Sequence, residues 1–334
     1  MSVEASLAAP DRAAVAVDVL ARARSVVAPA LEATLTRLSP ELADSVAEHL
    51  SGGGKHVRAG LVLVSAAACG ADERSAIDGA IAIELVHNFS LVHDDIIDSD
   101  EERRHRPTMW SSHGISHAII AGDALATVAF QALLDPPTPE RARAAALLAD
   151  ATQSMISGQA LDMAFERRNT VTLSECMEMV VGKTGALLMC ATQLGAVLGG
   201  AGEATIDALG AFGHHLGIAF QAIDDVLGIW GDPSVTGKPV GSDLRRHKMT
   251  LPICIAQAAG VELGSRWRTG DLVSDEDVAV ATATLESCGA RRSTLELGER
   301  HLGEALAALA RVPLLREPRD ELVAIADYVV ARDR

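Results

Sequence analysis

One long apolar segment constrains the fold more than any other feature of this chain. Residues 75–98, SAIDGAIAIELVHNFSLVHDDIID, are apolar on almost every side of a helix before the segment ends in acidic residues. A helix that is apolar all round has no face suited to water, so it must be covered by neighbours. The pattern therefore predicts a central helix of a bundle with carboxylates at its C-terminal end.

The rest of the sequence favours further long helices. Ala and Leu dominate the 334 residues, which are 49% hydrophobic and only 3% aromatic, and both residue types are strong helix formers. Breakers such as SGGGK at 51–55, DPPTP at 135–139 and GGAGE at 199–203 separate the helical patterns. We predict an all-α protein, a single-domain bundle of long helices over residues 13–334, after a flexible tail at 1–12.

Charge and cysteine content narrow the classes of partner. The chain has 29 basic and 45 acidic residues, a formal net charge of −16, whereas nucleic-acid backbones are bound by basic surfaces. The five cysteines are widely spaced with no CxxC pair, which favours reduced thiols and a cytoplasmic protein. No uninterrupted run reaches the roughly 20 apolar residues of a membrane helix. We expect neither a nucleic-acid partner nor a membrane span.

The acidic end of the 75–98 segment has the geometry of a cation site. Asp94 and Asp98 are four residues apart, so on a helix they share a face with Cβ atoms about 5–6 Å apart. At that distance two carboxylates repel by roughly 3 kcal/mol at an effective dielectric near 20. Acidic helix ends are often simply solvated, but the residues before these are apolar. Oxygen-only ligands at a buried position favour Mg²⁺.

A second acidic helix end repeats the pattern. HDDIID at 93–98 returns as IDDVLG at 223–228, again at the end of an apolar run. Gln221 and Asp224 are three residues apart and share a helical face. Lys238 and Lys248 follow within 25 residues. Each lysine alone is typical of a solvated loop, but carboxylates for a metal together with lysines for phosphate oxygens indicate a diphosphate site.

Six motifs in order resemble the trans-isoprenyl diphosphate synthases, or polyprenyl synthetases, and most resemble the short-chain geranylgeranyl and farnesyl diphosphate synthases of bacteria. The motifs are GGGKHVR (52–58), ELVH (84–87), HDDIIDSDEERRHRPT (93–108), GQALD (158–162), GKTGAL (182–187) and FQAIDDVLGIWGDPSVTGKPVGSDLRRHKMTLP (220–252). The resemblance implies the isoprenoid synthase fold, a bundle around a central cavity. It also implies head-to-tail (1'-4) condensation of isopentenyl diphosphate with dimethylallyl, geranyl or farnesyl diphosphate, by ionisation, condensation and elimination, in a homodimer.

The resemblance also implies a role for each matching residue. Three Mg²⁺ ions on the allylic diphosphate would be held by Asp94, Asp98 and Asp224, with support from Asp95, Asp225, Asp162 and Asp243. Contacts to the allylic substrate would come from Arg103, Lys183, Thr184, Gln221, Lys238 and Lys248. Isopentenyl diphosphate would bind in a second, metal-free pocket at Lys55, Arg58, His87 and Arg104. The catalytic set would be Asp94, Asp98, Asp224, Lys183 and Lys238.

Three features set this chain apart within the pattern. His56 and Ala59 stand where the first motif usually has arginine and proline, and the second acidic motif ends in Gly228 instead of aspartate. The inner metal shell at that end is therefore expected to be thinner.

Product length depends on the residues before the first acidic motif. Phe89, Ser90 and Val86 lie five, four and eight residues before Asp94. The resemblance implies that one aromatic beside a serine is an intermediate pattern, so we expect geranylgeranyl diphosphate (C20), with farnesyl diphosphate (C15) as the alternative. Phe89 could instead be a core residue that faces a neighbouring helix.

Two other functions compete with the synthase. A class I terpene cyclase would need aromatic faces around its cation, and the chain has only five Phe, three Trp and one Tyr. A non-catalytic partner subunit would tend to lose the first acidic motif or its arginines, and both are intact.

Overall fold

The computed structural model describes residues 9–232, 240–263 and 274–331. Its first elements in chain order are α1 (Ala9–Thr34), η1 (Leu35–Arg37), α2 (Pro40–Ser51), α3 (Val57–Ala68), η2 (Glu73–Ala76), α4 (Ile77–Ile97), β1 (Glu102–Arg103), β2 (Arg106–Pro107), α5 (Met109–His113), α6 (Ile115–Leu134) and α7 (Pro139–Phe165). The remaining elements are α8 (Leu173–Val180), η3 (Val181–Gly185), α9 (Ala186–Leu198), α10 (Glu203–Trp230), α12 (Ser242–Arg245), α13 (Leu251–Ala258), α15 (Asp275–Ser287), α16 (Ala290–Leu309) and α17 (Arg316–Val330). The two short strands are the only sheet in the described ranges, so the predicted all-α class is confirmed.

Contacts divide the chain into two compact units. The first comprises Met1–Asp150, Leu187–Ala211 and Ala308–Tyr328, and the second comprises Ala151–Ala186, Phe212–Ala307 and Val329–Arg334. The expectation of a single domain over 13–334 stays a prediction. Most of the predicted tail, residues 1–8, lies outside the described residues, and α1 begins at Ala9.

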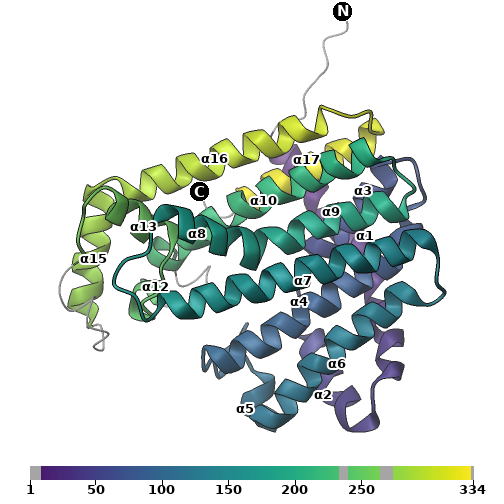
Figure 1. Ribbon diagram of the computed structural model, residues 1–334, viewed down its shortest axis with the longest axis horizontal. Coiled ribbons are helices and arrows are strands. Elements are labelled where there is room, and N and C mark those ends of the chain that lie inside the picture. The colour runs from purple at the N-terminus through teal and green to yellow at the C-terminus, as the bar shows by residue number, and fades with distance from the viewer. Residues whose placement is uncertain (1–8, 233–239, 264–273, 332–334) are drawn as a thin grey trace, which may run out of the picture. The chain divides into compact units, whose positions relative to one another are not determined.

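The first unit is organised around α4, the helix expected to be central. It packs against α6, α3 and α1, and Figure 1 shows α4 lying alongside α6 over most of its length. Its side chains from Gly79 to Val86 are all buried. The helix ends at Ile97 with Asp98 as its C-cap, and Ser99 then takes a left-handed φ of 56°. The helix is therefore buried as its apolar sequence predicts, and its acidic residues lie at the C-terminal end, where the chain leaves the core.

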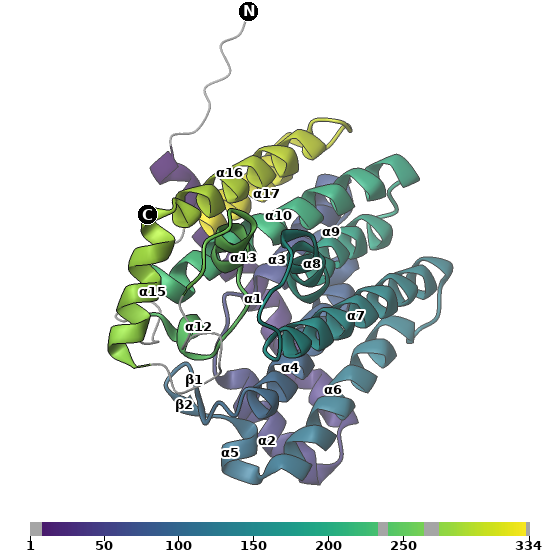
Figure 2. The same cartoon turned by 60° about the vertical axis from the view of Figure 1, so that its left-hand side comes forward.

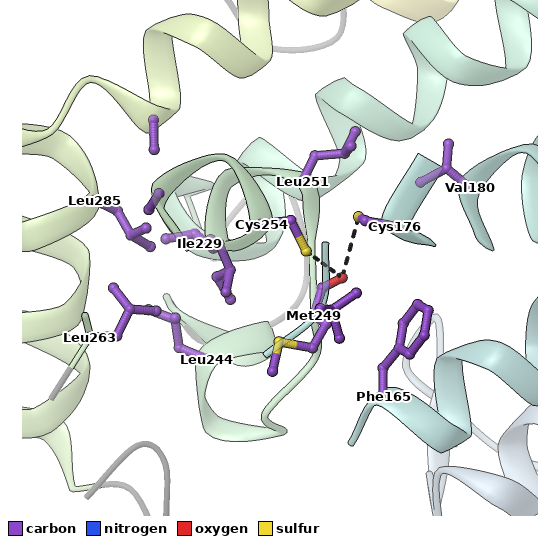
Figure 3. Close-up of a cluster of buried hydrophobic side chains, with 14 of the residues drawn as sticks. Phe165, Cys176, Val180, Ile229, Leu244, Met249, Leu251, Cys254, Leu263 and Leu285 are labelled. Carbon is purple, nitrogen blue, oxygen red and sulfur yellow. Dashed lines mark hydrogen bonds between the residues drawn. The ribbon is translucent and has the colours of Figure 1, made fainter. Parts of the chain in front are cut away.

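The second unit has its own hydrophobic core, drawn in Figure 3. Phe165, Ile229, Leu251 and Leu285, from four different helices, are all fully buried in it. Side-chain caps fix where two of its helices begin, because both α8 and α15 start with a reciprocal capping box. In Figure 2 the part of α10 in this unit runs beside α16. This core supports the chain on either side of the second acidic motif.

Three helical stretches are long and apolar enough to cross a membrane by length and composition alone. They are 73–97, 115–134 and 173–198, and 56%, 44% and 72% of their most apolar windows are buried inside the protein. Our sequence criterion of an uninterrupted apolar run did not detect them. In α4 and in the α8–α9 stretch the apolar side chains pack mainly against other helices. The middle stretch, α6, leaves more of its apolar surface exposed.

Candidate active site

The acidic end of α4 has the geometry that the spacing predicts. The Asp98 N–H donates to the Asp94 carbonyl oxygen at 2.8 Å, so the helical turn continues through both residues. Their side chains therefore share one face, and both are partly exposed. Asp95 points elsewhere: it is only 1% exposed and accepts a 2.7 Å hydrogen bond from Arg103 Nε. The motif thus separates two accessible carboxylates from one buried one.

Asp95 provides a test of whether a cation fits here. Burial raises the pKa of its carboxyl group, although the adjacent Arg103 opposes that rise. Its Oδ2 atom is buried and accepts no hydrogen bond within the part of the chain that the structure describes. A buried carboxylate oxygen without a donor is costly unless a cation or proton compensates it. Together with the oxygen-only donor set of Asp94 and Asp98, this environment fits Mg²⁺.

The arginines after the acids are placed by a tight hairpin. Strands β1 and β2 pair Arg103 with Arg106, and the two residues between them, Arg104 and His105, have φ values of 54° and 60°. Two positive φ values are what a two-residue hairpin turn of this hand requires. The hairpin directs neighbouring arginines apart: Arg103 goes to Asp95, while Arg104 Nη1 lies 3.5 Å from the position of a Cβ on Gly54.

A basic cluster forms where Arg104 meets the glycine loop. Arg58 and Arg104 are close enough to His87 that, after burial, they are the largest influences holding the pKa of this imidazole well below its usual range. The Lys55 ammonium lies 5.1 Å from the ring centroid of Tyr328 on α17. The structure therefore brings Arg58 and Arg104 to His87, whereas Lys55 is placed here by its contact with Tyr328. Cations around a neutral imidazole favour an anionic ligand.

The two departures in the first motif have a local explanation. Glu84 of α4 is only 5% exposed and accepts a 3.1 Å hydrogen bond from the Ala59 N–H at the start of α3. Its other carboxylate oxygen lies 3.4 Å from His56 Nδ1. A proline at position 59 could not donate this hydrogen bond. The side chain that fixes Lys55 and Arg58 relative to α4 thus uses the two residues that differ.

Strained backbone marks these segments. Within the described ranges, the non-glycine residues with positive φ are His56, Ser99, Arg104, His105 and His247. Each of the five is a predicted site residue or adjoins one in the sequence. Left-handed conformations in residues other than glycine cost free energy and concentrate at functional sites.

His49 belongs to this region and was missed by sequence reasoning. It lines a pocket together with Asn88, Arg103, Arg104 and Arg106. Burial first, and then Arg103, lowers its pKa to about 4. Nothing in the sequence distinguishes His49 from an ordinary histidine on α2, because the arginines reach it only through the fold.

We expect His49 to make stability depend on pH. An unfolded histidine has a pKa near 6.5, so below that pH the unfolded chain binds a proton that the folded chain refuses until about pH 4. Stability is therefore lost as the pH falls through 6.5, and by pH 5 this one group costs about 2 kcal/mol. Urea unfolding at pH 7.5 and 5.0 measures this: between the two pH values, the free energy of unfolding should fall by about 2 kcal/mol less in His49→Gln than in wild type. Equal losses in both proteins would contradict this assignment.

In the second unit, a buried carboxylate joins two of the predicted lysines. Lys183 Nζ donates to Asp162 Oδ2 at 2.6 Å, and Lys248 Nζ reaches the same oxygen at 3.3 Å. Burial alone would raise the pKa of Asp162, but the two ammonium groups outweigh it and the pKa is lowered. Lys248 also donates to Glu166 Oε1 at 2.7 Å. Glu166 was missed, although its position one turn after Asp162 was available from the sequence.

Close backbone contact with α7 places Lys183. Residues Val181–Gly185 form a single π-helical turn, η3, between α8 and α9, and such turns often occur at functional sites. A Cβ on Gly158 of α7 would stand 2.2 Å from the Lys183 backbone nitrogen. Glycine at position 158 is therefore what allows Lys183 to lie within reach of Asp162.

A hydrogen-bonded chain supports the second acidic motif. The Thr184 hydroxyl donates to Gln221 Oε1 at 2.5 Å, and Gln221 Nε2 donates to Asp225 Oδ1 at 2.7 Å. The other Asp225 oxygen accepts from the Leu251 N–H at 2.8 Å. Burial raises the pKa of Asp225 to about 7 despite these bonds. Asp225 is thus buried and held by hydrogen bonds, whereas the side chain of its neighbour Asp224 is partly exposed.

Two cysteines fix the backbone beside Lys248. The thiols of Cys176 and Cys254 approach the Met249 carbonyl oxygen, at 3.6 and 3.9 Å, as Figure 3 shows. All five cysteines are free thiols, as expected. The predicted residue Lys238 lies outside the described residues.

The predicted product-length residues all lie on α4. Phe89 is 9% exposed, and its ring meets the His93 ring edge-on with centroids 4.9 Å apart. His93 in turn lies against α6, with Nε2 3.1 Å from the Ile119 carbonyl oxygen. Val86 is fully buried, and the Ser90 hydroxyl donates to the His87 carbonyl oxygen at 2.7 Å. Phe89 therefore leans toward α6 through His93.

Comparisons with known proteins agree with this architecture. Residues 39–266 match the family model described as Polyprenyl synthetase. Over 332 residues the chain is 43% identical to the (2E,6E)-farnesyl diphosphate synthase of Mycobacterium tuberculosis strain H37Rv, covering 94% of this chain and 92% of the relative. It is 39% identical to the geranylgeranyl diphosphate synthase of the same strain over 331 residues, covering 94% and 93%. The solved polyprenyl synthetase of Streptomyces coelicolor A3(2) superposes with a TM-score of 0.87 at 43% identity, covering 94% of this chain and 99% of that one.

The fold and the motifs define an all-α prenyltransferase of the isoprenoid synthase type. The chain belongs to the polyprenyl synthetase family, and it is a trans-prenyl diphosphate synthase.

Proposed function

We propose that this enzyme joins isopentenyl diphosphate to an allylic diphosphate with Mg²⁺ and ends at geranylgeranyl diphosphate. The observation that carries the product length is the pairing of Phe89 with Ser90 on α4, five and four residues before Asp94. Farnesyl diphosphate is the second candidate, because a relative of that name is 43% identical to this chain. We place the reaction in the cytoplasm.

The proposal assigns the metal ions to residues whose environment suits them. Asp94, Asp98 and Asp224 would hold three Mg²⁺ ions on the allylic diphosphate, and Asp95, Asp225, Asp162 and Asp243 would support them. When bound, the ions would offset the negative charge that develops on the leaving diphosphate.

The cationic residues would divide the two substrates between them. Lys183, Lys248 and Lys238 would bind phosphate oxygens of the allylic substrate, with Arg103, Thr184 and Gln221 beside them. Lys183 and Lys248 are held by Asp162, so they are oriented before a substrate arrives. Lys55, Arg58, His87 and Arg104 would bind isopentenyl diphosphate without a metal. No residue is assigned to remove the final proton, and the released diphosphate is the proposed acceptor.

A product assay tests the proposal. Purified protein would be incubated with Mg²⁺, isopentenyl diphosphate and dimethylallyl, geranyl or farnesyl diphosphate, and the products measured by chain length. We expect all three primers to be extended and C20 to be the end product. A C15 product that is not extended would replace the C20 assignment, and no condensation with any primer would refute the function.

Phe89→Ala should lengthen the products. If the Phe89 ring closes the end of the chain pocket, its removal lets elongation continue beyond the wild-type product. Product length with farnesyl diphosphate as primer measures this. An unchanged length together with a loss of roughly 3–5 kcal/mol in unfolding free energy would instead identify Phe89 as a packing residue between α4 and α6.

Arg58→Ala should separate the two substrates. Arg58 lies close to His87, so its loss should raise KM for isopentenyl diphosphate far more than KM for the allylic partner. Lys183→Ala is the matched variant and should show the opposite preference. Equal losses for both substrates in Arg58→Ala would mean that the two pockets are wrongly assigned.

We also propose that the enzyme is a homodimer that pairs through α6. Ile115, Ile119 and Ile120 on this helix are 52%, 43% and 57% exposed, which is unusual for isoleucine. Burying them against a second copy would remove this apolar surface from water. Light scattering after size-exclusion chromatography should give twice the chain mass, and Ile120→Glu should shift it toward the monomer.

A further inference from the structure

The missing acid of the second motif leaves a space that another carboxylate fills. Residue 228 on α10 is glycine where the first motif has its last aspartate. A Cβ at Gly228 would stand only 1.9 Å from Asp243 Oδ2 and 2.5 Å from Asp243 Cγ. The Asp243 carboxylate therefore occupies the volume into which a side chain at position 228 would project.

The segment that carries Asp243 is held on α10 at this same point. The Ser242 hydroxyl lies 3.3 Å from the Gly228 carbonyl oxygen, and the Asp243 carbonyl accepts from the Lys248 N–H at 3.0 Å. Leu244, the next residue, is fully buried in the core of the second unit. These contacts hold the residues before and after Asp243 in place. The short distance between the Asp243 carboxylate and Gly228 is therefore part of the packed structure.

The position that Asp243 fills has a definite relation to Asp224. Residues 224 and 228 are four apart on one helix, as Asp94 and Asp98 are on α4. The carboxylates of Asp224 and Asp243 therefore lie about one helical turn apart along α10. Both also act on Asp225: after burial, their negative charges contribute to raising its pKa. The acidic pair of the first motif is thus reproduced here with its second member contributed from α12.

We propose that Asp243 supplies the carboxylate missing from position 228, and that Gly228 is the positioning residue that admits it. This inference rests on the proposed function, because it assigns the Asp224–Asp243 pair to the Mg²⁺ ions of the diphosphate. On this proposal the acidic shell at this end has two carboxylates, as the end of α4 has, in place of the thinner shell expected from the sequence. Glycine at position 228 is the condition under which Asp243 can take that place.

Moving the carboxylate from position 243 to position 228 tests the proposal through ligand binding, with no need to measure turnover. Binding of inorganic pyrophosphate would be measured by isothermal titration calorimetry with and without Mg²⁺. We expect Asp243→Ala and Asp243→Asn to weaken Mg²⁺-dependent binding by roughly tenfold to a hundredfold. Gly228→Asp in the Asp243→Ala background should restore binding to within a few-fold of wild type, because it returns one carboxylate to the same space. Gly228→Ala alone should weaken binding, because the added methyl group displaces Asp243.

The same assay is used for the control variants and for the results that would overturn the proposal. Gly303→Ala, on a helix with open space around it, should bind like wild type. Asp243→Asn keeps nearly the same shape, so it decides the question if Asp243→Ala does not fold. The proposal is overturned if the double variant binds no better than Asp243→Ala, or if Gly228→Ala binds like wild type. Wild type should bind some pyrophosphate without Mg²⁺ at the basic cluster around His87, so only the additional binding that Mg²⁺ brings is compared; no additional binding with Mg²⁺ would instead refute the metal assignment, and this inference with it.

Discussion

Asp94→Ala should lose several orders of magnitude in turnover while its helical content stays that of wild type. The Asp94 and Asp98 carboxylates share one face of α4 and repel each other when no metal is bound, so removing one does not weaken the apo fold. The same removal takes away an oxygen ligand, and with it the charge stabilisation that ionisation of the allylic diphosphate needs. Steady-state turnover with saturating Mg²⁺ and far-UV circular dichroism measure the two effects.

Glu101→Ala is the control for this variant. Glu101 belongs to the same acidic stretch but its side chain is exposed beyond the end of α4, so its loss should change turnover little. Near-wild-type turnover in Asp94→Ala would refute the metal assignment. An equal loss in Glu101→Ala would show that total negative charge matters and not the one-turn geometry.

Gly158→Ala should damage both stability and turnover. Its new Cβ would stand 2.2 Å from the Lys183 backbone nitrogen and 2.8 Å from the Gly182 carbonyl carbon, where no flexible side chain can move aside. Separating α7 from η3 should cost about 1–3 kcal/mol of unfolding free energy. It should also move Lys183 from Asp162, and a displacement of about 1 Å can cost about a hundredfold in rate.

Urea unfolding and kcat for the allylic primer measure this second prediction. Gly303→Ala again provides the comparison, since nothing lies within 4 Å of the added methyl group and alanine favours the helix. A Gly158→Ala protein as stable and as active as wild type would mean that the close contact between α7 and η3 is not required.

Local periodicity predicted those parts of the site that lie on single helices. Residues 75–98 are apolar all round, and α4 with the short turn before it occupies nearly the same range. The four-residue spacing placed Asp94 and Asp98 on one face, and the motif match grouped Arg58, His87 and Arg104, which the structure places near one another. The helical predictions depend on residues within one or two turns of each other. The grouping of the basic residues depends on the match to known motifs.

Relations made by packing between elements could not be predicted from the sequence. The pKa of His49 is lowered by burial and by an arginine more than 50 residues away, and the hairpin turn decides which arginine meets Asp95. The overlap of Asp243 with the space above Gly228 depends on how α12 is seated on α10. Periodicity reports which residues share a face, but not which distant segment comes to fill a gap in that face.

The most direct test of the central claim is a titration of each diphosphate alone, with and without Mg²⁺. The acidic helix ends are assigned to a metal-bound allylic diphosphate, and the basic cluster around His87 to a metal-free isopentenyl diphosphate. Calorimetry should therefore show that isopentenyl diphosphate binds in EDTA nearly as well as in Mg²⁺, whereas geranyl diphosphate binds only when Mg²⁺ is present. Equal dependence on Mg²⁺ for both diphosphates, or no dependence for either, would contradict the division of the site into these two halves.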